Sequence, residues 1–209
     1  MKPIFVTGIG TGIGKTLVSA ILAEALQADY WKPIQAGYES GTDLELVSGL
    51  VTNAQSQFHP EVYRLKMPAS PHIAARKEGK QINLNVISQQ YNLLKRENAR
   101  MVIEGAGGLL VPLNEKEFVI DLIGSLGALV ILVSRNYLGS INHSLLSARV
   151  CTNYGLDVAG WIFNDQYLDY EDEIVKWSGY KKLGTVPKVT EISRAFIQEQ
   201  AERLKQTLI

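Results

Sequence analysis

The stretch Gly8-Ile9-Gly10-Thr11-Gly12-Ile13-Gly14-Lys15-Thr16 decides the fold, and it directly follows the apolar run 3–7. Four glycines at alternate positions allow a tight turn whose N–H groups point inward, and a helix starting near Gly14 would add the positive end of its dipole. This pattern is typical of a phosphate-binding loop. In such loops the lysine reaches the β- and γ-phosphates and the next hydroxyl ligates Mg²⁺, which assigns these roles to Lys15 and Thr16.

The spacing inside this loop differs by one residue from the usual motif. The usual motif has a glycine where this chain has Ile9, and Gly8 comes one residue earlier. A dinucleotide-binding fingerprint fits worse, because its third glycine would fall at Ile13 or Lys15. A mononucleotide triphosphate site is therefore the favoured interpretation, and a glycine-rich turn without a ligand is the alternative.

The composition suits one α/β domain over residues 1–209. Of the 209 residues 46% are apolar and 20% are charged, which allows a substantial core. Lys plus Arg and Asp plus Glu number 21 each, so there is no basic surplus for nucleic acid, and small molecules or protein are the expected partners. No apolar run approaches the roughly 18 residues of a membrane span. We expect a cytoplasmic protein whose single cysteine, Cys151, is a buried structural thiol.

Strand and helix patterns alternate along the chain. The apolar periodicity predicts helices at about 15–27, 42–51, 70–78, 85–97, 120–126, 139–154, 171–177 and 190–208, and strands at 3–7, 29–32, 101–103, 128–133, 158–163 and up to 186. Thr42 and Ser70 are the expected caps of two of these helices. Residues 34–42 are predicted to form a loop and 53–70 a polar stretch. The run 128–133 is apolar on both faces, which places it in the middle of a doubly wound, mostly parallel sheet.

Polar residues gather where the predicted strands end. In a doubly wound sheet the carboxyl ends of the strands form the ligand-binding edge, and Lys32, Glu104 and Asn164 all fall there. Glu104 comes directly after a buried strand, where a metal ion would be its natural partner. The glycine-rich turn 105–108 could form a second anion nest facing the first. The sequence therefore suggests that something besides a nucleotide is bound at this edge.

For three of these polar residues an ordinary structural interpretation stays open. Asp43 either ligates Mg²⁺ or complements the dipole of the helix that begins there. Lys32 either faces the phosphates or reaches solvent, and Asn164 either reads an adenine edge or belongs to an ordinary turn. The three histidines are too scattered to indicate a zinc site.

Considered together, these motifs resemble the dethiobiotin synthetases, which are P-loop ATP-dependent carboxylases. The resemblance covers nearly the whole chain and depends on the joint order of several segments. These are 6–16 with its extra loop residue, 32–37, 42–43, 70–75, 104–108 with 112–113, Leu138-Gly139 with Asn142-His143, and 160–161 with Asn164-Asp165. The irregular spacing of the phosphate loop thus becomes a feature in favour of this family.

The resemblance implies a cytoplasmic homodimer that uses ATP, CO₂ and 7,8-diaminononanoate, with Mg²⁺, to make dethiobiotin. By position, Lys15, Lys32 and Thr11 would act on the transferring phosphoryl group and the carbamate, and Thr16, Asp43 and Glu104 would support Mg²⁺. The nucleotide would contact Gly12, Ile13, Gly14, Leu17, Gly105, Ala106 and Gly107, and adenine would lie against Asn164, Asp165, Pro187, Lys188 and Val189. The substrate would contact Ala36, Ser70, Gly107, Gly108, Gly139 and Asn142, some of them across the subunit interface.

Two positions depart from the family pattern. Family members often carry an acidic or polar residue where this chain has Gly12, and a serine or threonine where it has Ala36. The missing hydroxyl removes a possible hydrogen bond to the substrate, so Ala36 could line the pocket only by packing.

Two rival functions share the phosphate loop. An ATP-driven switch that dimerises on DNA or membranes typically has an extra lysine early in the loop, where this chain has Ile9, Gly10 and Thr11. A small-molecule kinase would explain the loop but would leave the turn after Glu104 with less to do.

Overall fold

A seven-stranded parallel sheet forms the centre of the protein. The computed structural model describes residues 1–165 and 167–208. The strands lie in the order β4 (Phe58–His59), β2 (Asp29–Trp31), β6 (Met101–Glu104), β1 (Ile4–Gly8), β7 (Leu129–Arg135), β8 (Val158–Asn164) and β9 (Lys182–Val186). Every neighbouring pair in this sheet is parallel, so all the carboxyl ends meet at one edge.

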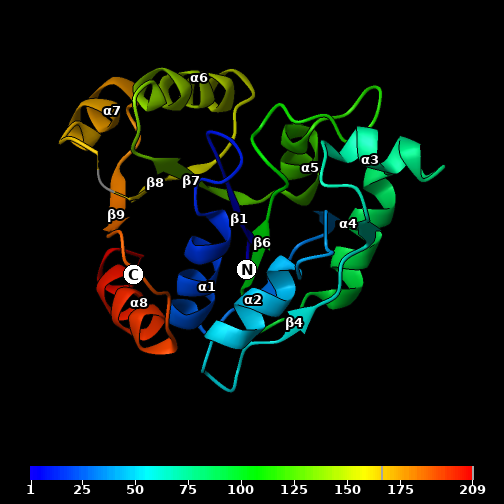
Figure 1. The fold of residues 1–209 in the computed structure, drawn as a ribbon, viewed down its shortest axis with the longest axis horizontal. Helices are drawn as coiled ribbons and strands as arrows, with labels where there is room; N and C mark the ends of the chain where they lie inside the picture. Colours follow the sequence, from blue (N-terminus) through cyan, green and yellow to red (C-terminus); the bar gives the residue numbers. More distant parts are fainter. Residues whose placement is uncertain (166, 209) are drawn as a thin grey trace.

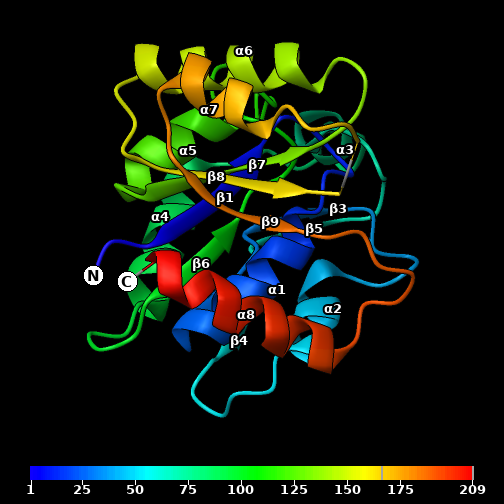
Figure 2. The same ribbon diagram turned by 90° about the vertical axis from the view of Figure 1, so that its left-hand side faces the viewer.

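Helices cover both faces of the sheet, as Figures 1 and 2 show. One face packs against α1 (Lys15–Leu26), α2 (Asp43–Leu50) and α8 (Arg194–Leu208). The other packs against α3 (Pro71–Lys77), α4 (Leu84–Leu94), α5 (Val119–Leu126), α6 (Ser140–Asn153) and α7 (Glu171–Ser178). The doubly wound α/β fold predicted from the alternating pattern is confirmed, and the main sheet is wholly parallel.

Side chains in each strand alternate between the two cores. In β1, Ile4 and Val6 belong to the core under α1, whereas Phe5 belongs to the opposite core. In β2, Tyr30 faces the α1 side and Trp31 the other side. This alternation follows from the two-residue period of a strand, and it decides which polar side chains can meet beyond the strand ends.

The phosphate loop leaves β1 through a very close backbone contact. A Cβ atom added to Gly8 would lie 2.0 Å from the carbonyl oxygen of Val133 in β7. Gly14, with φ of 94°, caps α1, and a Cβ there would lie 2.0 Å from the side-chain nitrogen of Asn164. Glycine is therefore required at both ends of the loop for different reasons, close approach at Gly8 and both crowding and a left-handed conformation at Gly14.

Short strands depart from the sequence-based expectations. Residues 34–36, expected in a loop, form β3 (Ile34–Ala36), which pairs in parallel with β5 (Tyr63–Leu65) in a separate two-stranded sheet. The polar stretch 53–70 contains β5 and also β4, which joins the edge of the main sheet. Segments of two or three residues are too short to show a periodicity, so only their tertiary pairing reveals them.

Smaller corrections concern positions along the chain. The middle strand of the main sheet is β1, and the doubly apolar run 128–133 supplies its neighbour β7, which is also covered on both faces. The helix expected to reach residue 97 ends at Leu94, and the terminal helix begins at Arg194 instead of about residue 190. Thr42 caps α2 as expected, in a capping box with Glu45.

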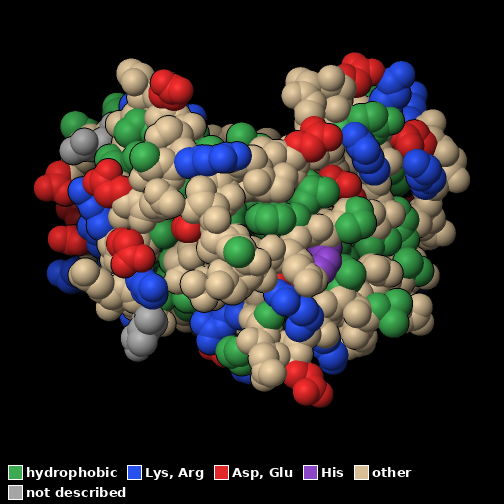
Figure 3. Space-filling view, turned by 90° about the horizontal axis from the view of Figure 1, so that it is seen from below, with side chains coloured by type: hydrophobic (Ala, Val, Ile, Leu, Met, Phe, Trp, Pro, Cys, Tyr) green, Lys and Arg blue, Asp and Glu red, His purple; other side chains and the backbone are tan. Residues whose placement is uncertain are grey.

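The surface carries mixed charge on the face drawn in Figure 3, where basic and acidic side chains are interspersed. No helix within residues 1–165 and 167–208 is both long and apolar enough to cross a membrane. Cys151 is buried, and burial raises the pKa of its thiol to about 12. This agrees with the structural role expected for that thiol.

We predict that Gly8→Ala will destabilise the protein far more than Gly10→Ala. The new methyl group at Gly8 would collide with the backbone of Val133, whereas a Cβ at Gly10 meets no atom within 4 Å. Overpacking of this kind costs about 1–3 kcal/mol of unfolding free energy. Urea denaturation of both variants would measure the difference, and equal stabilities would contradict the close approach of β1 to β7.

Candidate active site

A cleft of about 740 Å³ opens at the carboxyl edge of the main sheet. Its walls come from the phosphate loop, the end of β2, the start of α2, the segment 68–70 and the turn after β6. The lining includes Thr11, Gly12, Gly14, Lys15, Thr16, Leu17, Lys32, Ile34, Gln35, Ala36, Asp43, Leu46, Pro68, Ala69, Ser70, Glu104, Ala106, Gly107 and Val111. Residues from five separate parts of the chain therefore share one cavity.

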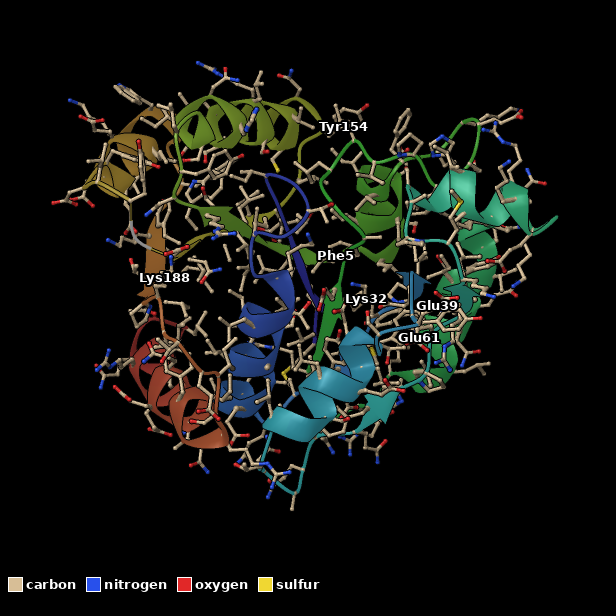
Figure 4. All side chains as sticks on the ribbon, viewed as in Figure 1. Phe5, Lys32, Glu39, Glu61, Tyr154 and Lys188 are labelled. Atoms are coloured by element: carbon tan, nitrogen blue, oxygen red, sulfur yellow. The ribbon has the colours of Figure 1, made fainter. Side chains whose placement is uncertain are left out.

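The parallel register of β2 and β6 brings Lys32 beside Glu104. Trp31 pairs with Ile103. The residues that come next in the two segments, Lys32 and Glu104, therefore lie side by side. The Nζ atom of Lys32 donates to Oε1 of Glu104 at 3.0 Å and also contacts Oδ2 of Asp43 at the start of α2. Lys32 is only 7% exposed, so the solvent-reaching interpretation of this lysine is wrong. Figure 4 shows it near the centre of the molecule.

Glu104 is the carboxylate to which the neighbouring polar side chains donate hydrogen bonds. It is 1% exposed, and its Oε1 atom also accepts a hydrogen bond from Thr16 Oγ1 at 2.9 Å. Its other oxygen, Oε2, accepts one from the hydroxyl of Tyr30 at 2.9 Å. Burial raises the pKa of Tyr30 well above its usual value, and the charge on Glu104 adds to this effect, so the phenol stays protonated.

The two lysines of the cleft have opposite pKa shifts. Burial lowers the pKa of Lys15 to about 8, partly opposed by Glu104, while the nearby charge of Lys32 lowers it further. The Nζ atom of Lys15 donates to the carbonyl of Gly10 at 2.6 Å, within its own loop. Burial also lowers the pKa of Lys32, but the negative charges of Glu104 and Asp43 outweigh this effect. The pKa of Lys32 is therefore raised. Lys32 therefore keeps its charge in the ligand-free protein.

The second glycine-rich turn packs against the phosphate loop. A Cβ atom on Gly108 would lie 3.1 Å from the carbonyl oxygen of Gly8, and one on Gly107 would lie 3.6 Å from Oγ1 of Thr11. Gly107 has a φ of 75°, and the N–H of Gly105 donates to the carbonyl of Val6 at 2.9 Å. The two turns thus face each other, which is the arrangement expected from the sequence for two neighbouring anions.

Comparisons with known proteins identify the family. A family profile described as an AAA domain matches residues 2–195. The ATP-dependent dethiobiotin synthetase BioD of Cytophaga hutchinsonii is 46% identical over 98% of this chain and 97% of its own. That of Rhodopseudomonas palustris strain BisB18 is 41% identical over 93% of this chain and 91% of its own. The chain belongs to the dethiobiotin synthetase family. It is therefore an ATP-dependent enzyme of biotin synthesis.

Solved structures show how widely this fold is shared. The septum site-determining protein MinD of Pyrococcus horikoshii, in complex with Mg-ADP, has a TM-score of 0.64 at 16% identity, covering 98% of this chain and 89% of its own. The MinC:MinD complex of Aquifex aeolicus gives 0.65 at 14% identity, covering 99% and 94%. At such low identity the likeness concerns the fold alone, and it agrees with the P-loop type predicted from the sequence.

Several residues assigned to the nucleotide lie outside the cleft lining. Ile13 is buried under the phosphate loop, and its carbonyl accepts a hydrogen bond from Asn164 Nδ2 at 2.9 Å. The N–H of Asp165 donates to the carbonyl of Val186 at 3.1 Å, so the ends of β8 and β9 are neighbours, and residues 187–189 directly follow β9. In Figure 4, Lys188 lies beside β9, on the other side of α1 from Lys32. The proposed adenine-binding residues are thus close to one another but apart from the carboxylates.

Of the residues assigned to the substrate, Gly108 directly follows the lining residue Gly107, whereas Gly139 and Asn142 lie apart from this cleft. Gly139 caps the start of α6 with a φ of 101°, and Asn142 is exposed one turn later. Ser70, by contrast, lines the cleft at the start of α3. Its hydroxyl lies 3.0 Å from Nδ1 of His72 and does not cap the helix as expected.

Sequence reasoning missed three side chains that organise the site. Gln35 is 7% exposed, lines the cleft, and holds the loop before α2 through bonds to Gly37 and Asp43. Arg135 donates to the carbonyl of Gly12 at 3.3 Å and pairs with Asp165 at 2.9 Å. Tyr30 lies in β2, and Lys32 directly follows that strand two residues later. This two-residue spacing in extended chain is the one sequence signal that could have placed both near Glu104.

We predict that nucleotide affinity will fall as the pH rises above about 8. Below that pH Lys15 already carries its charge, but above it the free protein must take up a proton before the ammonium can meet the phosphates. The apparent Kd for ADP should then rise by up to tenfold per pH unit.

Titration calorimetry in two buffers of different ionisation enthalpy would measure this proton uptake directly. Lys15→Met should bind more weakly and should show no uptake. Constant affinity and no proton uptake in the unaltered protein, up to about pH 9.5, would contradict a lowered pKa of Lys15.

Proposed function

We propose that this enzyme converts 7,8-diaminononanoate, CO₂ and ATP into dethiobiotin, ADP and phosphate. The convergence of Lys15, Lys32 and Glu104 on one cleft is the observation that carries this proposal. Two buried cations next to a phosphate loop suit a reaction in which two anions, a triphosphate and a carbamate, must approach each other.

The reaction proceeds in three steps in this proposal. One amine of the substrate adds CO₂ and loses a proton, which gives a carbamate. A carbamate oxygen attacks the γ-phosphorus of ATP, ADP leaves, and a carbamic-phosphoric mixed anhydride forms. The second amine attacks the carbonyl carbon, phosphate leaves, and the loss of a proton completes the five-membered ring. No covalent bond to the enzyme is required.

The residues of the cleft divide this work between them. Lys15 and Thr11 hold the γ-phosphoryl group, and Lys32 holds the carbamate next to it. The N–H groups of Gly107 and Gly108 bind the carbamate from the facing turn. The protein forms no covalent bond to the transferring phosphoryl group. It therefore accelerates the reaction by positioning the reactants and by stabilising the charge of the transition state.

The donor atoms around Glu104 fit Mg²⁺. The hydroxyl of Thr16 and the carboxylates of Asp43 and Glu104 are hard oxygen ligands, and both Thr16 and Asp43 lie on helices that start at the cleft. Within residues 1–165 and 167–208 no three His, Cys, Asp or Glu side chains form a metal cage. Phosphate oxygens and water would complete the shell, and the ion would neutralise charge on the phosphates.

The apolar part of the cleft suits the alkyl chain of the diamine. Ala36, Leu46, Pro68 and Val111 line the cleft together with Ser70. Ala36 contributes by packing in place of the hydroxyl found in other family members. Gly139 and Asn142 lie outside this cleft, so we assign them to the substrate of a second subunit in a homodimer. We also assign the enzyme, as one domain over residues 1–209, to the cytoplasm.

We predict that the purified enzyme will consume ATP only when the diamine and CO₂ are both present. Phosphoryl transfer requires the carbamate as acceptor, so omission of either substrate should stop ADP release. A coupled ADP assay measures this. Steady ATP hydrolysis without the diamine, stimulated by DNA or anionic vesicles, would instead support the rival function of an ATP-driven switch.

We predict that Lys32→Gln will lower turnover by roughly 10²–10³-fold and leave ADP binding nearly unchanged, because Lys32 meets the carbamate while Lys15 and the loop hold the nucleotide. Lys66→Gln is the matched control, because Lys66 is exposed and pairs only weakly with Glu39 at 3.5 Å. Steady-state kinetics and calorimetry separate the two effects, and urea denaturation checks the fold. Near-normal turnover in Lys32→Gln would refute the assignment.

A further inference from the structure

The hydroxyl of Tyr30 is a buried polar group for which the proposed reaction has no direct use. Tyr30 is fully buried in β2, on the face of the sheet that packs against α1. It is not among the residues that line the cleft, so it would not touch a bound ligand. Its hydroxyl donates a hydrogen bond to Oε2 of Glu104 at 2.9 Å.

The two oxygens of Glu104 have separate partners. Oε1 faces the cleft side, where it accepts from Thr16 at 2.9 Å and from Lys32 at 3.0 Å. Oε2 faces the sheet, where it accepts from Tyr30. Rotation about the last bond of a glutamate is broad and nearly two-fold, so the side chain itself does not fix the plane of the carboxylate. Thr16 and Lys32 hold the Oε1 end of the carboxylate, and Tyr30 holds the Oε2 end, because turning the plane would break its bond.

Such a bond matters most where the carboxylate must meet a cation. Carboxylates that ligate metals are usually held by an outer hydrogen bond, and its removal typically costs about 10- to 100-fold in metal affinity or activity. Tyr30 has the required features: it is buried, it belongs to a rigid strand, and β2 pairs directly with β6, which ends at Glu104.

We propose that Tyr30 is a positioning residue that fixes the Glu104 carboxylate, so that Oε1 is presented to Mg²⁺ bound together with the nucleotide. This inference rests on the proposed role of Glu104 as a magnesium ligand. Tyr30 acts through Glu104 and contacts neither the nucleotide nor the diamine.

Tyr30→Phe tests the inference, because it removes the hydroxyl and keeps the ring in the core. Calorimetry would measure the Kd for ADP once in EDTA and once in saturating Mg²⁺. The ratio of these two Kd values gives the tightening due to the metal. We expect ADP binding in EDTA to stay within about twofold of the unaltered protein, and the tightening by Mg²⁺ to fall by about tenfold or more. The Mg²⁺ concentration for half-maximal turnover should rise in parallel.

Tyr170→Phe is the matched control. Tyr170 is also largely buried, and its hydroxyl lies 2.7 Å from Ser140 Oγ and donates to the carbonyl of Tyr137 at 3.1 Å. Tyr170→Phe removes buried hydrogen bonds away from Glu104, so the tightening of ADP binding by Mg²⁺ in this variant should equal that of the unaltered protein. Urea denaturation of both variants gives the structural cost of each lost bond.

The outcomes separate this inference from the proposed function. Equal weakening of ADP binding with and without Mg²⁺ would show that Tyr30 only supports the fold, and unchanged tightening would show that Glu104 does not need it. Either result overturns the inference and leaves the proposed reaction intact. If Mg²⁺ does not tighten ADP binding even in the unaltered protein, the magnesium assignment fails and this inference fails with it.

Discussion

The buried ammonium of Lys32 between Glu104 and Asp43 is the interaction on which the site depends. An unpaired charge in the protein interior is very costly, so neither Glu104, at 1% exposure, nor Lys32, at 7%, would be stable there alone. Their pairing is a direct consequence of strand order, because β2 lies next to β6 and their parallel register places Lys32 beside the end of β6. The order and register of the strands thus bring these charged groups together.

Close backbone packing shapes the phosphate loop that lies beside these charged residues. Gly8 lies against the Val133 carbonyl, and Gly108 in turn lies against the carbonyl of Gly8. The ends of β1, β6 and β7 and the two glycine-rich turns therefore lie close together, in space that side chains would otherwise fill. Lys15 is buried in this loop, and its burial lowers the pKa of the ammonium to about 8.

Long periodic segments could be predicted from the sequence, whereas short pairings could not. The helix after the loop is long enough to show its period, and the run 128–133, apolar on both faces, is long enough to indicate the buried strand β7. Strands β3, β4 and β5 have two or three residues, and their neighbours determine them. In the site, Lys32 beside proline could equally have reached solvent. Its burial follows from register, and the links from Gln35 to Asp43 and from Tyr30 to Glu104 depend on the same tertiary arrangement.

The likeness to MinD proteins shows that this framework alone does not determine function. A nucleotide switch needs the phosphate loop and a metal ion held beside it. The same cleft is also lined by the apolar side chains of Ala36, Leu46, Pro68 and Val111. An alkyl chain that ends in an anion matches a lining that holds both apolar side chains and Lys32, whereas a hydrolytic water does not need the apolar ones. These apolar residues are therefore where a ligase of this fold would differ from a switch.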